Sequence, residues 1–413
     1  MEKSVSLKGK IIAIIFSAVA ALLAVALVLV IVLYPPSDAF ISSSGIQGVV
    51  SDIESTPQNI VSSDNTVVSS QESSDTSSET VTTPQNVPSD LESISPMKSK
   101  HEVPEDATDF NITLSFLGDM ILASNNYDQS AGSFNSYAAS HDPSYFLEKV
   151  RPVLEADDFT IANVENVFTD RQLTPVYKDY SPAFWFGSKA SNINILSNAG
   201  VEGAMIANNH IRDYGTEGYN DSVQAITGAG MVYGDASRIM YFEKGGYVIA
   251  VVSSGMWGEY QANNIVNLIK EAEQHSHYQV VIFHGGTEKI HEPEEWKRRA
   301  ARKLVDNGAD LVVGGHPHVL QPREVYNGVE IVYSIGNFCY GGHRKPENRT
   351  VIYQMSLTIN KQDLTLKSSA SNIMPCYVFT GTVNNFQPAI IEDGDPIKQR
   401  ILDFMDGKIS SPV

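Results

Sequence analysis

The chain has 413 residues, with 48 acidic against 29 basic side chains and a formal net charge of −19. This length allows one large domain or two ordinary ones. The acidic balance argues against nucleic acid as a partner, because phosphate backbones attract basic patches. Two cysteines, Cys339 and Cys376, are too few for a disulfide framework. A single bridge between them and two free buried thiols both remain open.

The first feature along the chain is an uncharged apolar run over residues 11–34. About 20 such residues span a bilayer as a helix. Lysines precede this run, and the next basic residue after it is Lys98. The positive-inside rule therefore predicts a cytoplasmic tip over residues 1–10, a single-pass signal-anchor helix over 11–34, and an extracellular remainder at the cell membrane. The alternative is a cleaved signal peptide, but its apolar core is usually only about 7–15 residues long.

The next segment, residues 35–108, is rich in Ser, Thr, Asp, Gln and Pro, and its acidic residues have no basic counterpart before Lys98. Such a composition cannot bury enough apolar surface to offset its chain entropy, so we expect disorder. Repulsion between its acidic side chains favours extension. We therefore predict an acidic linker that holds a folded domain, residues 109–391, away from the membrane.

Within that domain, short β-branched runs alternate with stretches of helical period, which predicts an α/β fold. The predicted strands are Ile112–Leu117, Phe159–Asn163, Gly203–Ala207, Tyr247–Ser253, Gln279–Phe283, Leu311–Val313 and Glu330–Ser334. The predicted helices are Tyr145–Leu154, Ser191–Asn198, Glu217–Thr227, Ile265–His275 and Glu294–Asn307, the last with Pro293 in its first turn and Gly308 at its stop. Further strands are predicted at Val351–Ile359, Asp363–Lys367 and Tyr377–Val383, followed by a helix and tail over 392–413.

Polar residues follow several of these strands. They are Asp119, Asn163-Val164-Glu165, Asn208-Asn209-His210, His284 and His316-Pro317-His318. Each alone has a plain structural interpretation: an aspartate after Gly118 can be a turn or an N-cap. Delivered together to one sheet edge, three histidines, two carboxylates and an amide can bind divalent zinc, iron or manganese. Such a site activates water at neutral pH for attack on phosphorus or carbonyl centres.

The ordered motifs resemble those of the calcineurin-like metallophosphoesterase superfamily, and within it the bacterial capsule-synthesis CapA family with its poly-γ-glutamate member PgsA. The resemblance covers about residues 112–340. Its most specific stretches are 308–322, which contains Gly-Gly-His-Pro-His, then 333–338, and Ala207-Asn208-Asn209-His210 with Asp213. It implies a four-layer α/β/β/α sandwich.

The resemblance also implies a site for two divalent metal ions, whose ligands would be Asp119, Glu165, Asn209, His284, His316 and His318. Glu165 would bridge the ions, with Asp119 and His318 on the first and the other three on the second. His210 would be the catalytic acid. Residues placed near the substrate would be Asn208, Asp213, Glu288 and Asn337.

Two departures from the resemblance stand out. Ile121 stands where the wider superfamily has a histidine, two residues after its first aspartate. The CapA branch also tends to lack this histidine, so the first metal site is one ligand poorer. His284-Gly285-Gly286 stands where the CapA branch usually has His-Trp-Gly.

Three functions fit this pattern. The first is a membrane-anchored component of capsule biosynthesis that acts outside the cell with polymer-synthesising membrane proteins on poly-γ-glutamate or a related anionic exopolymer. The second is a free-standing cell-surface metal-dependent phosphoesterase or hydrolase. The third is a non-catalytic scaffold. A family link does not fix a pathway, and the first is our prediction for the biological role.

Overall fold

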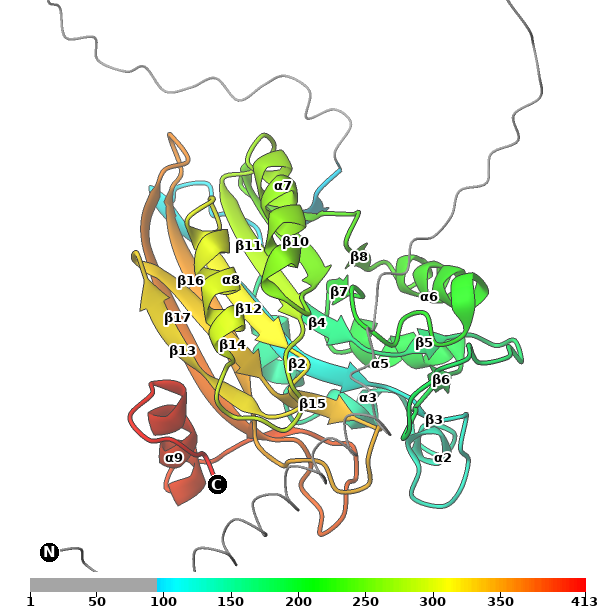
Figure 1. Ribbon diagram of the computed structural model, residues 1–413. Helices are drawn as coiled ribbons and strands as arrows, with labels where there is room; N and C mark the ends of the chain where they lie inside the picture. Colours follow the sequence, from blue (N-terminus) through cyan, green and yellow to red (C-terminus); the bar gives the residue numbers. More distant parts are fainter. Residues whose placement is uncertain (1–94) are drawn as a thin grey trace, which may run out of the picture. The chain divides into compact units, whose positions relative to one another are not determined.

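The computed structural model describes residues 95–413 (Figure 1). The predicted cytoplasmic tip, the anchor helix and most of the linker lie outside these residues. Within the described part of the chain, no helix combines the length and apolar character needed to cross a bilayer.

One sheet of the fold has seven strands in the order β1-β9-β10-β11-β12-β14-β13. Its core is parallel, from β10 through β11 and β12 to β14. Antiparallel β9 and β13 flank this core. The bounds are β1 Met97–Lys98, β9 Met240–Lys244, β10 Tyr247–Gly255, β11 Tyr278–His284, β12 Leu311–Gly315, β13 Leu320–Tyr326 and β14 Val329–Ile335.

The second sheet has eight strands, in the order β18-β17-β16-β2-β4-β7-β8, with β15 also paired to β2. Strands β2, β4, β7 and β8 are parallel, whereas β16 and β17 form a long antiparallel pair. The bounds are β2 Asp109–Ile121, β4 Phe159–Val164, β7 Gly203–Met205, β8 Val232–Gly234, β15 Asn337–Tyr340, β16 Thr350–Asn360, β17 Leu366–Tyr377 and β18 Ala389–Ile390. A small third sheet joins β3 Ser124–Asn125, β6 Phe186–Ser188 and β5 Val167–Phe168.

The two large sheets pack face to face, and helices cover both outer faces (Figure 1). Apolar side chains of β2 and β10 meet in the shared core, among them Leu114 and Val251. Helices α7 and α8 bury Ile265 and Leu304 against the first sheet. Helices α3 to α6 cover the second sheet, burying Leu154 and Ile226. The described residues thus form a mixed α/β fold with four layers, in agreement with the predicted layer order.

The helical segments flanking these sheets are short. Their bounds are α2 Phe134–Ala138, α3 Ser144–Leu147, α4 Arg151–Ala156, α5 Asn194–Ser197, α6 Gly215–Gly228, α7 Ala262–Ala272, α8 Glu295–Val305 and α9 Pro396–Met405, with 3₁₀ turns η2 Ala190–Ile193 and η3 Glu259–Gln261.

Most of the predicted elements are present, because their burial follows their sequence pattern. Strand β10 is apolar from Tyr247 to Val252 and is buried as far as Ser254, so both of its faces are covered, as those of central parallel strands are. Strand β16 alternates between buried and half-buried positions along its second half, which suits an antiparallel strand with one covered face. Gly308 has φ +104° just beyond α8 and ends that helix as predicted.

Several predicted boundaries are wrong. The helix over Tyr145–Leu154 is two helices, α3 and α4, because Pro152 lacks the N–H that a continuous helix would need. Pro293 precedes α8, whose first residue is Glu295, instead of lying in its first turn. The strand over Asp363–Lys367 begins only at Leu366, because Thr365 N donates to Asp363 Oδ1 in a turn.

No strand is present over Tyr377–Val383. Strand β17 ends at Tyr377, and the chain stays irregular until β18. Side chains here bind the backbone and compete with sheet pairing: Asn385 Oδ1 accepts from Thr380 N, and Asn384 Oδ1 accepts from Phe386 N.

Both ends of the predicted domain also need correction. Strand β1 pairs with β9, so ordered structure begins before the predicted boundary at residue 109. At the other end α9 belongs to the core, since Ile401 and Phe404 are buried in the cluster between the sheets. Cys339 and Cys376 are free and buried, which decides between the two alternatives left open by the sequence.

Candidate metal centre

The candidate metal centre lies where the carboxyl ends of parallel strands from both large sheets meet. Glu165 directly follows β4, His284 ends β11, and His316 directly follows β12. The sequence predicted that a strand would end before Asp119, but β2 continues past this residue to Ile121. The reason is β15, whose Asn337 pairs with Asp119 and extends the sheet. Loops at such strand ends commonly carry function in α/β proteins.

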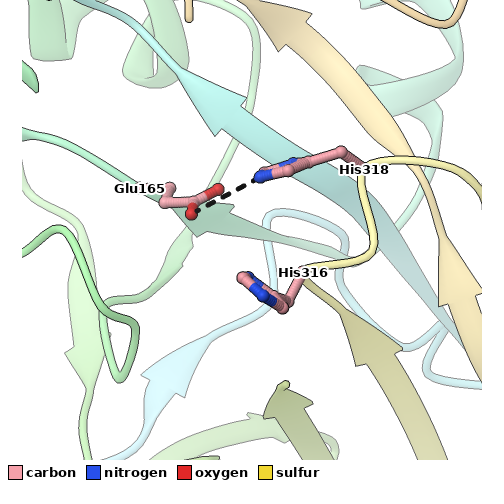
Figure 2. A group of neighbouring side chains, drawn as sticks. All are labelled: Glu165, His316 and His318. Atoms are coloured by element: carbon pink, nitrogen blue, oxygen red, sulfur yellow. Dashed lines mark ion pairs between the residues drawn. The ribbon is translucent and has the colours of Figure 1, made fainter. Parts of the chain in front are cut away.

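Glu165 is the centre of this cluster. Its side chain is 0% exposed, and neither carboxylate oxygen has a hydrogen-bond partner. Figure 2 shows Glu165 facing His316 and His318, with the ion pair to His318 marked. His284 Nε2 lies 3.3 Å and His318 Nε2 4.0 Å from Glu165 Oε1. A buried carboxylate without hydrogen bonds is costly, so this arrangement fits a divalent cation.

Three electron-pair donors converge beside Glu165. His284 Nε2 lies 2.8 Å from Asn209 Oδ1 and 3.1 Å from His316 Nδ1. A neutral imidazole carries one N–H, so His284 Nε2 can satisfy at most one of these neighbours by donation. A shared cation would satisfy all of them. This is the ligand group that the resemblance implies for the second metal ion.

Asp119 and His318 form the other half of the cluster. His318 Nδ1 lies 3.2 Å from Asp119 Oδ2 and 3.0 Å from Asn337 Oδ1, so its Nε2 is free to face Glu165. Burial opposes charge on both groups. For Asp119, the hydrogen bond from His318 and the nearby His284 outweigh burial and hold the pKa well below its usual value. For His318, burial is outweighed by Glu165 and Asp119, and its pKa rises to about 9.

The two Glu165-containing groups with metal-ligand spacing are Glu165 with His316 and His318, and Asp119 with Glu165 and His284. Glu165 is common to both groups, which pair the other ligands differently from the resemblance: His316 lies with His318, and Asp119 with His284. The donors, imidazole nitrogen with carboxylate and amide oxygen, suit zinc, iron or manganese. The cluster supports divalent metal binding.

Local backbone geometry fixes the histidine pair. His316 and His318 have φ of +92° and +57°, which non-glycine residues rarely adopt, and Pro317 lies between them. His316 N donates to Asp119 Oδ2 at 2.9 Å. A Cβ on Gly315 would lie only 2.6 Å from Asp119 Oδ1, so a glycine is needed for this approach.

Trp257 was not predicted as a site residue. Its ring, 42% exposed, lies edge-on to His316 with centroids 4.7 Å apart, and 5.7 Å from the His284 ring. Gly285 could not carry the tryptophan of the resembled motif, because a Cβ there would meet Met256 O at 1.8 Å. Burial, then the neighbouring imidazoles, lowers the pKa of His316 to about 2, which keeps it neutral as a metal ligand must be.

His210 lies at the edge of the cluster, and Asp213 contacts its imidazole on the side away from the cluster. Its Nδ1 lies 2.7 Å from Asp213 Oδ2, and its Nε2 lies 3.9 Å from Glu165 Oε1. Asp213 also accepts from Lys178 Nζ at 2.6 Å and from Phe186 N at 2.7 Å. The carboxylate therefore fixes the imidazole orientation and directs Nε2 toward the cluster.

The residues predicted to contact substrate divide into two kinds. Asp213 and Asn337 are 1% exposed, and their side chains bind His210 and His318, so their positions suit orientation of those histidines. Asn208 likewise binds within the protein, donating to Val164 O and accepting from His210 N. Glu288 is exposed and lines a cleft beside the cluster.

That cleft has a volume of about 440 Å³ and includes His210 and His318 in its wall. Its other walls combine aromatic Phe186 and Tyr340 with basic Lys289 and Lys345, and with acidic Glu288 and Glu347. A cleft of this size beside a polar cluster fits a small substrate or one segment of a polymer.

Ile121 stands where a further histidine would bind the first ion. It is 0% exposed and packs in an apolar cluster with Phe186 and Tyr340. The side chain therefore belongs to the core, and no donor replaces it among the described cluster residues.

An α/β fold that joins carboxylates, histidines and an amide at the meeting edge of two sheets is characteristic of a metal-binding protein. The model of the family described as "Bacterial capsule synthesis protein PGA_cap" matches residues 113–341, more than half of the chain, so the chain belongs to this family. The resemblance to the bacterial capsule-synthesis family seen in the sequence is thereby confirmed.

Curated relatives agree with this assignment. "PGA biosynthesis protein CapA" of Bacillus subtilis is 31% identical over 233 residues, covering 51% of this chain and 60% of that protein. "Capsule biosynthesis protein CapA" of Bacillus anthracis is 28% identical over 243 residues, covering 51% and 58%. The chain thus matches about three fifths of the length of these relatives. A solved structure described as a novel phosphatase from Mycoplasma pneumoniae is 14% identical, with a TM-score of 0.39, covering 64% of this chain and 94% of that one.

Proposed function

We propose that this protein is a metal-dependent hydrolase of phosphoester type that serves capsule or exopolymer biosynthesis at the outer face of the cell membrane. The observation that carries the hydrolase proposal is Glu165, a buried carboxylate with two unpartnered oxygens among imidazole donors. A protein retains such a group at a cost, and a cation relieves that cost. Glu165, Asp119, His284, His316 and His318 would hold divalent metal there, together with Asn209.

Divalent metal held here would supply Lewis acidity and lower the pKa of water to near neutral. The chain itself supplies positioning. Asn163 Nδ2 donates to Asp119 Oδ1 at 2.7 Å and fixes that carboxylate. Asp213 holds His210 by Nδ1, so His210 Nε2 can give a proton to a leaving oxygen on a substrate in the adjoining cleft.

The biological role rests on the family and on the predicted topology. The relatives' names associate them with PGA and capsule biosynthesis. A membrane anchor over residues 11–34 and an acidic linker would place the folded domain outside the cell, where polymer emerges from membrane-bound synthesis proteins. Lys289 and Lys345 in the cleft wall give an anionic polymer or phosphoester a favourable contact.

The test is turnover of bis(p-nitrophenyl) phosphate by the full-length chain loaded with Mn²⁺ or Zn²⁺. His210→Ala should lower kcat by about 10²–10⁴-fold while metal content stays unchanged, the range for loss of a general acid. His275→Ala is the matched control, because His275 follows α7 outside the cluster. Metal binding without turnover of phosphodiester, phosphomonoester or amide substrates would contradict hydrolysis. It would favour the scaffold alternative, for which Ile121 is the supporting observation.

A further inference from the structure

One lysine outside the metal cluster is buried close to His210. Lys178 belongs to the irregular segment 176–185 between β5 and β6, and only 9% of its side chain is exposed. Other side chains of this segment, such as Tyr177 and Tyr180, are exposed. Lysine is almost never buried unless it is paired, so a specific partner must hold Lys178 in place.

That partner is Asp213. Lys178 Nζ donates to Asp213 Oδ1 at 2.6 Å and to Phe184 O at 2.5 Å. An ammonium group has three donors, so these two bonds leave at most one donor open. The described residues that line the cleft beside the metal cluster do not include Lys178. The ammonium group is therefore directed into the protein and is not placed to contact a substrate in that cleft.

The two oxygens of Asp213 have different partners. Oδ1 accepts from Lys178, whereas Oδ2 accepts from Phe186 N at 2.7 Å and lies 2.7 Å from His210 Nδ1. The last torsion of an aspartate side chain is broad and nearly twofold, so a partner that holds Oδ1 also fixes the direction of Oδ2. Asp213 is buried, so bulk water does not compete for either oxygen.

We propose that Lys178 is a positioning residue for the proton transfer assigned to His210. It holds Asp213 Oδ1, which leaves Oδ2 to orient the imidazole with Nε2 toward the metal cluster and the cleft. This inference rests on the proposed hydrolase function. It extends the acid to a chain of three residues, Lys178, Asp213 and His210, in which only His210 reaches the reacting atoms.

The test compares two phosphodiesters that differ in their need for a proton donor. The full-length chain loaded with Mn²⁺ is assayed with bis(p-nitrophenyl) phosphate, which has a good leaving group, and with diphenyl phosphate, whose leaving group is more basic. Lys178→Met should lower kcat about tenfold on the first ester and up to about a hundredfold on the second, the range for one charged hydrogen bond. The more basic leaving group depends more on the acid. KM and metal content should stay unchanged.

A double-mutant cycle on bis(p-nitrophenyl) phosphate separates positioning from a general effect on the fold. In the His210→Ala background, Lys178→Met should lower kcat no further, because the group that it positions is gone. Lys178→Arg keeps the charge and should recover part of the rate. Should Lys178→Met unfold, Lys178→Gln keeps a neutral donor and should give the same order of losses at smaller size.

Trp185→Phe is the matched control within the same segment. It removes the hydrogen bond from Trp185 Nε1 to Val176 O but leaves Lys178 and Asp213 paired, so kcat should stay near the wild-type value on both esters. Equal losses on both esters, a further loss in the His210→Ala background, or loss of metal from Lys178→Met would overturn the positioning role. A wild type that binds metal but hydrolyses neither ester would overturn the hydrolase proposal and this one together.

Discussion

Buried carboxylates flank strand β4 at both ends, and the two ends differ in the groups that lie beside these carboxylates. Before β4, Asp157 Oδ1 lies 2.9 Å from Lys100 Nζ, and Asp158 Oδ1 lies 2.7 Å from Lys244 Nζ. Glu202 joins this cluster through Lys100 at 3.0 Å. After β4, the described residues give Glu165 no lysine, no arginine and no hydrogen-bond donor.

The two ends differ in what their buried carboxylates do: those at the amino end stabilise the fold through ion pairs, and we propose that Glu165 binds metal. At the amino end the chain supplies its own cations, Lys100 and Lys244. At the carboxyl end the described residues offer Glu165 imidazole groups, among them His318 at 4.0 Å, but no hydrogen bond, and we propose that a cation from solution completes the site. A buried charge is tolerated only when it is paired or binds metal. Lysines pair with the carboxylates at the amino end, and we propose metal binding at the carboxyl end.

The largest expected effect comes from removing the protein's own cation. Lys100→Met leaves Asp157 and Glu202 without their shared partner. We expect a loss of about 3 kcal/mol in unfolding free energy, the low end for a broken buried pair because Lys100 is partly exposed. Urea unfolding at pH 7 measures it. Stability equal to the wild type would show that the amino-end cluster does not need its cation.

The pH dependence of the same cluster gives a second prediction. Burial raises the pKa of Glu202 to about 7. The folded state therefore holds this proton more tightly than the unfolded state, so the contribution of Glu202 is stabilising below its unfolded pKa and is lost as pH rises through 7. Between pH 4.5 and 7.5 the wild type should lose on the order of 2 kcal/mol that Glu202→Gln does not lose. Parallel pH profiles of the two proteins would contradict this.

At the carboxyl end the sign should reverse. Glu165→Gln, measured in chelator, removes a buried carboxylate charge that accepts no hydrogen bond, so unfolding free energy should rise by about 1 kcal/mol. Asp158→Asn is the matched control at the amino end of β4. Its unfolding free energy should fall by a similar amount, because Lys244 loses its partner. Destabilisation by both substitutions in chelator would show that the protein alone satisfies Glu165.

The smallest effect concerns the wall of the metal cluster. Trp257→Ala removes the ring beside His316 and should weaken Zn²⁺ binding about two- to tenfold, the worth of one aromatic contact. Competition with a fluorescent chelator measures this. Trp257→Phe keeps a ring and should restore most of the affinity; equal affinity in all three proteins would remove Trp257 from the site.

The sequence predicted the parts of the site whose signal is local. Apolar runs that end in Asn-Val-Glu or Gly-Gly-His-Pro-His show in the sequence alone where a strand ends. Parallel strands then bring such ends to one edge of the sheet. For that reason Glu165, His284 and His316 could be placed before the structure was known. The α/β class likewise follows from the alternation of strands and helices, whereas the four-layer order was implied by the family resemblance.

What the sequence missed depends on contacts distant along the chain. Trp257 has no periodic signal, and only the packing of β10 beside β11 brings it to His284 and His316. Lys100 falls in a segment whose composition predicts disorder, yet its partners Asp157 and Glu202 hold it in the fold.

The most direct test of the account is the metal content of the full-length chain after loading with Mn²⁺ or Zn²⁺ and gel filtration. The wild type and the control Glu202→Gln should each retain about two equivalents, as a dinuclear site requires. Glu165→Gln and the His316→Ala, His318→Ala double variant should retain one or none. A wild-type chain that binds no metal under these conditions would contradict the central claim that Glu165 binds a cation taken up from solution.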